Sequence, residues 1–577
     1  MSVFTTRPVI MGTNGMVTST HYLATMSGIQ ILLKGGNAID AGAAVWLSLT
    51  VLEPWIVGPA GESPILVYSS DLGRVVAVNG QGTAPKGSTI DWFESHGYEL
   101  IPPDGFLPAV VPGALDAWIL ALSNFGTMTF GQVAAPAIQL ASRGFPITTN
   151  FARAIARSET RFREEWPSSA ELYLPKGRLP HPGHIFINPD WARTFKRIVD
   201  AEEKERQSGR DVGLDAVRRH FYEGPVARAI VDFTTRFRCR DRYGQEHHGL
   251  LTTEDLAEYR GKIENTASVD YRGYTVHKCG PWSQGPVFLQ QLRLLEGFDL
   301  KSMGHNSAQY LHTWIECAKL AYADREEYYA DPDSADVPLD ILLSKEYASE
   351  RRKLVDQEVA SMELRPGMRE PRRLVKSSRG EDVLGTVHLD TADASGNLLS
   401  ATPSGGWIPT SPIIPGLGFP LGTRGQMFHL DSSHPEKLVP GKRPSTTLTP
   451  SLVTLSDQPY LGFGTPGGDQ QDQWNTQLFL NIVEFGMDLQ EALDSPSVHT
   501  THFPGSFWPH GASPGEVSVE ERIPEEVRKE LLAKGHKIIV SRGWSHGRCC
   551  AIRCDPENGV IYGAASPRTQ TPYAVGW

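Results

Sequence analysis

Residues 385–404, GTVHLDTADASGNLLSATPS, form the stretch on which the interpretation of this chain depends. A β-branched and apolar run after Gly385 leads into the turn-forming residues 393–397, and a second apolar run returns through residues 398–404. The pattern predicts a β-hairpin with Thr386 at its start. Thr402 and Ser404 on the returning strand would then bring further hydroxyl groups towards Thr386.

Thr386 is a candidate nucleophile for amide chemistry. A threonine hydroxyl is a weak nucleophile unless a base removes its proton, and a free α-amine on the same residue can be that base. The α-amine has a reference pKa of about 7.7–8.0, so much of it is neutral near pH 7. This chemistry requires a cut between Gly385 and Thr386, where glycine offers little steric obstruction. A β-branched residue that serves only its strand is the alternative.

A second glycine-rich turn, Thr465-Pro466-Gly467-Gly468, is suited to an oxyanion hole. Without side chains at Gly467 and Gly468, two backbone N–H groups can approach a tetrahedral intermediate. The helical pattern QWNTQLFLNIVEFGM (473–487) follows this turn, and its dipole would add positive potential. An ordinary turn without a catalytic role is the alternative interpretation.

The rest of the chain predicts a layered α/β protein with a helix-rich first half and a strand-rich second half. Helical patterns occupy residues 21–54, 113–126, 130–145 and 307–330, and a strand-like run occupies residues 63–80. After Val383 the pattern changes to short strands at 383–391, 397–404, 451–457, 459–464, 537–543 and 559–565. Residues 203–217 and the basic stretch 364–380 are predicted to be loops.

Composition and charge argue against several classes of function. The 577 residues carry a formal net charge of -11, and no basic stripe interleaved with aromatics suggests nucleic-acid binding. No signal-like start or apolar run of membrane-spanning length is present, so we expect no membrane partner and a cytoplasmic location. Cys549, Cys550 and Cys554 lack zinc-ligand spacing and are expected to be buried thiols. The chemistry requires no metal and no cofactor.

Ordered motifs along almost the whole chain resemble the gamma-glutamyltranspeptidase family. They are KGGNAIDAGAA (34–44), VVPGALDAW (110–118), LLTTEDLAEY (250–259), AYADREEYYADPD (321–333), GTVHLDTADASGNLLSAT (385–402), KRPSTTLTPS (442–451), GFGTPGGDQQ (462–471) and YGAASPR (562–568). The resemblance implies the αββα sandwich of the N-terminal-nucleophile hydrolases. It also implies a large subunit of residues 1–385 and a small catalytic subunit of residues 386–577, which remain together as a heterodimer of cleavage products and can assemble further.

The same resemblance assigns roles to individual residues. Thr386 falls on the family's nucleophile, Ser404 on the assisting hydroxyl, and Gly467 with Gly468 on the oxyanion glycines. Thr446 and Thr447 fall on two serines that hold the α-carboxylate of the substrate.

The glutamyl pocket is where this chain departs from the family. Gln81 stands at the position of an arginine that binds the α-carboxylate, His429 at that of an aspartate and Gly406 at that of an asparagine that hold the α-ammonium. Losing such charge-assisted hydrogen bonds, each about 1.5–3 kcal/mol, predicts poor turnover of gamma-glutamyl compounds. Arg424 is a candidate for binding a carboxylate or carbonyl of a smaller acyl group, with an exposed arginine that has no partner as the alternative. The expected substrate-binding residues are Gln81, Thr402, Gly406, Arg424, Gln426, His429, Thr446 and Thr447.

The leading hypothesis is a self-processed amidohydrolase or acyltransferase acting on a small-molecule amide, either dicarboxylate-type or oxamate-like. One alternative is a gamma-glutamyl hydrolase or transpeptidase with a divergent pocket. Another, of a different class, is a processed but inactive scaffold that binds a small ligand.

Overall fold

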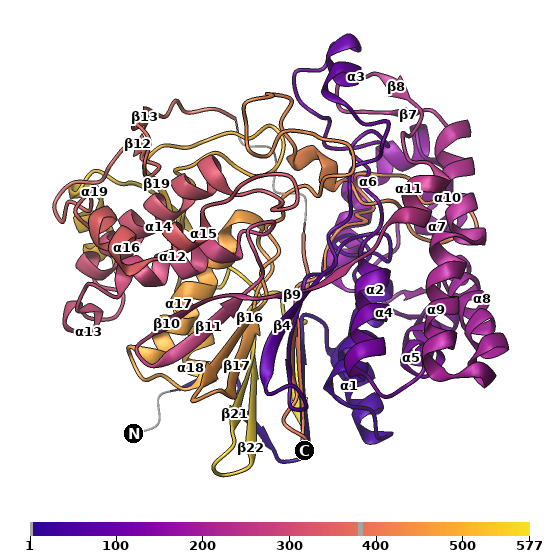
Figure 1. Cartoon of the computed structure of the whole chain (residues 1–577), viewed down its shortest axis with the longest axis horizontal. Coiled ribbons are helices and arrows are strands. Elements are labelled where there is room, and N and C mark those ends of the chain that lie inside the picture. Colours follow the sequence, from indigo (N-terminus) through magenta and orange to yellow (C-terminus); the bar gives the residue numbers. More distant parts are fainter. Residues whose placement is uncertain (1–3, 379–384) are drawn as a thin grey trace.

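The computed structural model describes residues 4–378 and 385–577 and contains two large sheets of seven strands each (Figure 1). The predicted hairpin consists of β14 (Leu389–Asp393) and β15 (Leu398–Ala401), which pair antiparallel. The Thr386–Ser404 bridge continues this register beyond the strand ends. The ladder is interrupted there because Pro403 has no N–H to donate.

The hairpin lies in the middle of one sheet, whose strand order is β23-β2-β14-β15-β3-β4-β9. Its other strands are β2 (Gly15–Ser19), β3 (Ile65–Ser69), β4 (Arg74–Asn79), β9 (Lys262–Asn265) and β23 (Tyr573–Gly576). All pairs in this sheet are antiparallel. Strands from before and after residue 385 therefore share one hydrogen-bonded ladder.

The other large sheet has the strand order β1-β22-β21-β17-β16-β11-β10 and is likewise antiparallel. Its strands are β1 (Ile10–Gly12), β10 (Ala267–Tyr271), β11 (Tyr274–Lys278), β16 (Ser451–Leu455), β17 (Gln458–Gly464), β21 (Cys550–Asp555) and β22 (Val560–Ala565). Both sides of residue 385 again contribute.

The two sheets stack, and helices cover the outer face of each (Figure 1). On β3 the side chains alternate, so that Ile65 and Val67 face one hydrophobic core while Leu66 and Tyr68 face the layer between the sheets. One helical layer includes α1 (Tyr22–Leu33), α2 (Ala38–Leu52), α4 (Ala114–Phe125), α5 (Phe130–Arg143), α8 (Pro189–Glu205) and α9 (Arg210–Tyr222). The opposite layer includes α12 (Gly285–Leu295), α14 (Ala308–Tyr328), α17 (Gln471–Val483) and α18 (Leu489–Asp494).

The remaining elements extend these layers. They are the helices α3 (Ile90–Ser95), α6 (Thr149–Glu164), α7 (Pro167–Tyr173), α10 (Pro225–Arg236), α11 (Thr253–Glu258), α13 (Leu300–Met303), α15 (Leu339–Leu342), α16 (Lys345–Arg352) and α19 (Glu525–Ala533), with a small sheet of β18 (Val498–Thr500), β19 (Glu516–Glu520) and β20 (Lys537–Ser541). Among the described residues, no helix is long and apolar enough to cross a membrane.

The predicted helices are confirmed, but the loop predicted at 203–217 is wrong. This stretch contains the end of α8, a short 3-10 turn (Arg206–Ser208) and most of α9. The polar residues form solvent-facing helical surfaces, and buried Glu202 accepts hydrogen bonds from the first backbone N–H groups of α5, at Phe130 and Gly131. Polarity alone did not reveal this capping contact.

The other loop prediction, 364–380, is confirmed for its described residues. They contain only the short strands β12 (Glu363–Leu364) and β13 (Arg372–Arg373), and residues 379 and 380 lie outside the described residues. The strand predicted to begin at Val383 has a different first residue in the structure. Residues 383 and 384 lie outside the described residues, and the regular strand begins at Leu389.

The three clustered cysteines do not share one environment. Cys550 is buried, whereas Cys549 and Cys554 are partly exposed. Burial raises the pKa of each thiol, that of Cys554 to about 12. All three thiols are therefore protonated at neutral pH.

Candidate active site

Thr386 lies at the edge of the hairpin, opposite Ser404, and only 4% of its surface is exposed. Its hydroxyl donates a hydrogen bond to Ser404 Oγ at 3.2 Å. The predicted nucleophile and the predicted assisting hydroxyl are therefore in direct contact.

The carbonyl oxygen of Gly385, on the peptide bond before Thr386, accepts two side-chain hydrogen bonds. Ser404 Oγ donates one at 2.8 Å and Trp407 Nε1 donates the other at 2.8 Å. A Cβ atom on residue 385 would lie 2.1 Å from Ile56 Cγ2, which is far inside van der Waals contact. Packing against Ile56 therefore requires glycine at this position.

Arg548 contacts the backbone of the nucleophile and a buried carboxylate. Its Nη2 donates to the Thr386 carbonyl oxygen at 2.7 Å, and its Nη1 pairs with buried Glu53 at 3.0 Å. Its backbone N–H donates to Thr465 Oγ1 at 2.8 Å, which links the nucleophile to the glycine turn. Burial raises the pKa of Glu53, against the opposing charge of Arg548.

A buried chain of polar groups begins two residues after the nucleophile, at His388. His388 Nε2 lies 3.0 Å from Asp390 Oδ1, and His388 Nδ1 lies 2.9 Å from Thr402 Oγ1. Thr402 is fully buried, and its hydroxyl shares a hydrogen bond with His388. Thr402 therefore contacts His388 on the neighbouring strand.

Backbone angles and close packing distinguish the two glycines of the glycine turn. Gly467 and Gly468 have φ angles of 148° and 56°, and a Cβ atom on Gly467 would lie 2.3 Å from Trp474 Cζ3. Neither backbone N–H has a hydrogen-bond partner among the described residues. Both N–H groups can therefore serve a developing negative charge.

An ion pair anchors this turn to the first half of the chain. Arg325 on α14 donates to Asp469 Oδ1 at 2.6 Å, and Ser506 donates to the same oxygen at 2.5 Å. The hydroxyl of Tyr322 donates to the backbone carbonyl of Asp469. Gln284 contacts the Gly468 carbonyl at 3.4 Å.

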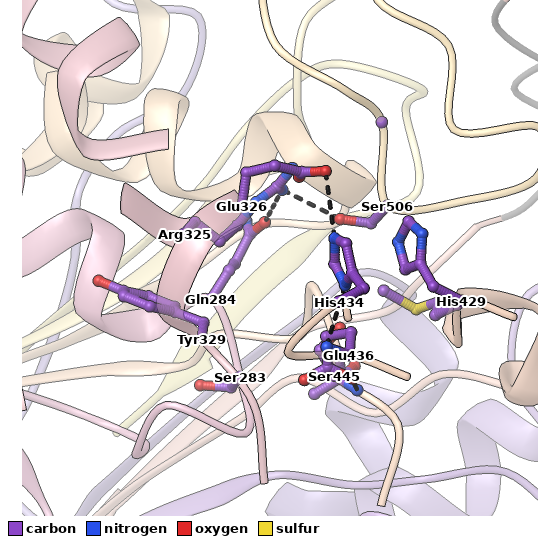
Figure 2. A pocket seen from close by; sticks show the side chains of 13 residues that line it. Ser283, Gln284, Arg325, Glu326, Tyr329, His429, His434, Glu436, Ser445 and Ser506 are labelled. Carbon is purple, nitrogen blue, oxygen red and sulfur yellow. Dashed lines mark hydrogen bonds and ion pairs between the residues drawn. The ribbon is translucent and has the colours of Figure 1, made fainter. Parts of the chain in front are cut away.

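A pocket of about 430 Å³, open to solvent, lies beside the anchored turn (Figure 2). His429 and Thr446, both expected substrate contacts, line it together with Arg325, Glu326 and His434. Phe507 follows the lining residue Ser506, and its ring lies 3.3 Å from a Cβ position on Gly468. The pocket therefore approaches the glycine turn.

The imidazole of His429 in this pocket is neutral near pH 7. Burial, and then the nearby rings of His510 and His434, lower the pKa of His429 to about 3. His434 Nδ1 accepts from the backbone N–H of Glu436 at 3.0 Å, so its ring proton is on Nε2. This proton faces Glu326 Oε1 at 3.6 Å, and although burial alone would raise the pKa of Glu326, the nearby His434 and Arg325 lower it to about 2. The three side chains Glu326, His429 and His434 lie close enough for a metal ion, but His434 presents a proton there instead of a lone pair.

Arg424 is buried and has a partner. It is 1% exposed, its Nε donates to Glu62 Oε1 at 2.6 Å, and its guanidinium lies over the rings of Trp407 and Phe507. The interpretation as an exposed, unpaired arginine is wrong because the arginine is buried and Glu62 neutralises it. A substrate carboxylate would have to compete with Glu62.

The other expected substrate-binding residues differ in whether their polar groups already have hydrogen-bond partners. The Gln81 amide and the Thr447 hydroxyl are buried and have no partner among the described residues. The Gln426 amide instead donates to the backbone carbonyls of Pro103 and Thr423. Gly406 has a φ of 67° and packs against Gly58.

Sequence reasoning missed several residues of the site. His388 and Asp390 share a strand face with the period of two, and this signal was present in the opening stretch. Trp407, Glu62, Arg325 and Arg548 had no local signal because their partners are distant in sequence.

Comparisons with known proteins agree over the full length. The sequence model of the gamma-glutamyltranspeptidase family matches residues 24–576. The Acylase ACY 1 proenzyme of Pseudomonas sp. (strain SE83) is 33% identical over 98% of this chain and 94% of its own. The glutathione hydrolase-like YwrD proenzyme of Bacillus subtilis (strain 168) is 31% identical over 97% of this chain and 98% of its own. The solved structure of LmbA2991HD is 44% identical over 100% of both chains, with a TM-score of 0.95.

Proposed function

The chain belongs to the gamma-glutamyltranspeptidase family of amide-cleaving hydrolases and acyltransferases, and from that premise we propose that it cuts itself between Gly385 and Thr386 and then uses Thr386 as an N-terminal nucleophile. One observation carries the proposal. The Thr386 hydroxyl, Ser404 Oγ and the Gly385 carbonyl oxygen form a continuous hydrogen-bonded chain at that peptide bond. We assign the stacked layers to the αββα sandwich of N-terminal-nucleophile hydrolases.

In turnover, the free α-amine of Thr386 takes the proton of its own hydroxyl as Oγ attacks the acyl carbon of the amide. The N–H groups of Gly467 and Gly468 stabilise the oxyanion. The amine leaves, and water or another amine resolves the acyl-enzyme. The chemistry uses no metal or organic cofactor.

The products 1–385 and 386–577 would remain together as a heterodimer. Both large sheets contain strands from each product, for example β2 beside β14 and β11 beside β16. Separating them would break the five strand pairs that join the two products and expose the core between the sheets. Higher assembly is compatible with this arrangement.

We propose that the acyl donor is a small amide other than gamma-glutamyl, either dicarboxylate-type or oxamate-like. Gln81 and His429 are uncharged where the family has opposite charges that bind a zwitterion. The pairing of Arg424 with Glu62 weighs against a donor that needs Arg424 for a distal carboxylate. This favours the shorter, oxamate-like class.

Denaturing electrophoresis with N-terminal sequencing tests the processing step. We expect two fragments, the smaller beginning at Thr386, and a single uncut chain for the T386A variant. T386S, which keeps a hydroxyl, is the matched control and is expected to be cut. An uncut wild-type chain, or a new N-terminus elsewhere, would contradict the proposal.

A donor screen with the processed enzyme tests the acyl preference. We expect kcat/KM for a gamma-glutamyl anilide to be at least about 100-fold below that for the best short amide, because two charge-assisted contacts are missing. Efficient gamma-glutamyl turnover would instead support a hydrolase or transpeptidase with a divergent pocket. A correctly cut chain without activity on any amide would support the inactive binding scaffold.

A further inference from the structure

Trp407 donates directly to the carbonyl oxygen of the bond that we expect to be cut. We propose that the Trp407 indole N–H, with the Ser404 hydroxyl, forms an oxyanion hole used for self-cleavage and distinct from the Gly467–Gly468 hole used for amide turnover. This inference rests on the proposed function. Its basis is the pair of 2.8 Å hydrogen bonds that both donors make to the Gly385 oxygen.

The self-cleavage step balances with groups that the chain supplies. Thr386 Oγ bonds to the Gly385 carbonyl carbon, and the carbonyl oxygen gains negative charge next to Ser404 and Trp407. The bond from that carbon to the Thr386 nitrogen then breaks, and the hydroxyl proton ends on this nitrogen, which becomes the α-amine. Water hydrolyses the resulting ester, leaving a Gly385 carboxylate and a free Thr386 hydroxyl.

The surroundings hold the Trp407 ring in place before the reaction. The ring is 1% exposed, and its N–H is shared with the Ile56 carbonyl oxygen at 3.1 Å. The Arg424 guanidinium lies 4.9 Å from the ring centre. Gly405 and Gly406, with φ angles of 83° and 67°, turn the chain directly after Ser404 so that Trp407 returns to the cleavage site. A donor fixed before the reaction needs no reorganisation as charge develops.

The two sets of donors share no acceptor among the described residues. No hydrogen bond within the described residues joins the N–H groups of Gly467 or Gly468 to the Gly385 oxygen. After cleavage, Gly385 becomes a chain end, and a substrate carbonyl replaces it as the target of Thr386. Maturation and turnover should therefore respond differently to loss of the indole N–H.

The test measures maturation and turnover separately in full-length chains. A pulse of cell-free synthesis followed by a chase gives the rate of self-cleavage on denaturing gels, and kcat is then measured per mole of mature small fragment. Removing one oxyanion donor costs about 100-fold or more in rate. For W407F we expect maturation to slow by about 100-fold. The fold-loss in kcat should be at least ten times smaller than the fold-loss in maturation rate.

Two further variants separate the hydrogen bond from packing. W314F removes the same volume at a fully buried tryptophan whose Nε1 has no partner among the described residues, and should mature at the wild-type rate. Site-specific replacement of Trp407 by 3-benzothienylalanine keeps the ring shape without the N–H, and should slow maturation as W407F does even if W407F folds poorly.

The outcomes distinguish this inference from the proposed function. A wild-type chain that is never cut at Gly385–Thr386 would refute the proposed function itself. A wild-type chain that is cut there, while the benzothienyl variant matures at the same rate, would overturn only the role of Trp407. Equal losses of maturation rate and kcat would also overturn it, because one oxyanion hole would then serve both reactions.

Discussion

Replacing Gly385 by alanine should block self-cleavage through a steric contact with Ile56. The added Cβ would lie 2.1 Å from Ile56 Cγ2 and 2.8 Å from its Cβ, whereas ordinary contacts begin at 3.4 Å. Relieving the overlap requires a displacement of about 1 Å at the peptide bond that Thr386 attacks. A misplacement of about 1 Å can cost about 100-fold in rate. We therefore expect G385A to mature about 100-fold more slowly than wild type.

A second substitution tests the cause. I56A removes Cγ2, so the G385A/I56A double variant should recover some of the lost rate, about ten-fold, while Cβ of residue 56 still interferes. I56A alone should mature normally but lose about 2–5 kcal/mol of stability, which chemical denaturation would measure. G87A is the matched glycine control, because its new Cβ would meet only Leu250 O at 3.7 Å.

The assay is the time course of cleavage on denaturing gels after a synthesis pulse. Wild-type maturation in G385A would refute the steric argument outright. A double variant as slow as G385A would show that Ile56 is not the obstacle.

Ion pairs and protonation at the site give three further predictions. R325M should lower kcat about 10- to 100-fold while maturation persists, because Asp469 beside the oxyanion glycines loses its ion pair with Arg325. Steady-state kinetics per mole of mature fragment measures this effect. An unchanged kcat would contradict the prediction. R548M should lower the free energy of unfolding in urea by about 3–5 kcal/mol because Glu53 is left buried without its cation, and E53Q should restore much of the loss. The folded-state pKa of His429 is about 3, so its unfolded form takes up a proton first as the pH falls below 6.5. Its contribution to stability is therefore complete above pH 6.5 and lost progressively towards pH 3, and H429Q should flatten the dependence of Tm on pH in this range.

The sequence by itself determined the hairpin, the glycine turn and the main helices. These features depend on local rules, namely the alternation of apolar residues, turn residues at 393–397 and helical periodicity, which neighbours in sequence are enough to establish. Family motifs added Thr386, Ser404, Gly467 and Gly468 as a set. The local rules failed at residues 203–217. The polar residues of this stretch form the solvent-facing surface of α8 and α9, and the contacts that stabilise the two helices are made by other residues.

Only the tertiary structure decided which groups act on which. The sequence made Arg424 a candidate substrate ligand or an exposed arginine without a partner, yet it is bonded to Glu62, 362 residues away along the chain. Trp407 reaches the Gly385 oxygen, and Arg548 reaches Thr386 from 162 residues away. Hydrogen bonds and charge pairing depend on distances of a few ångströms, and only the packing of the two sheets brings these distant segments that close.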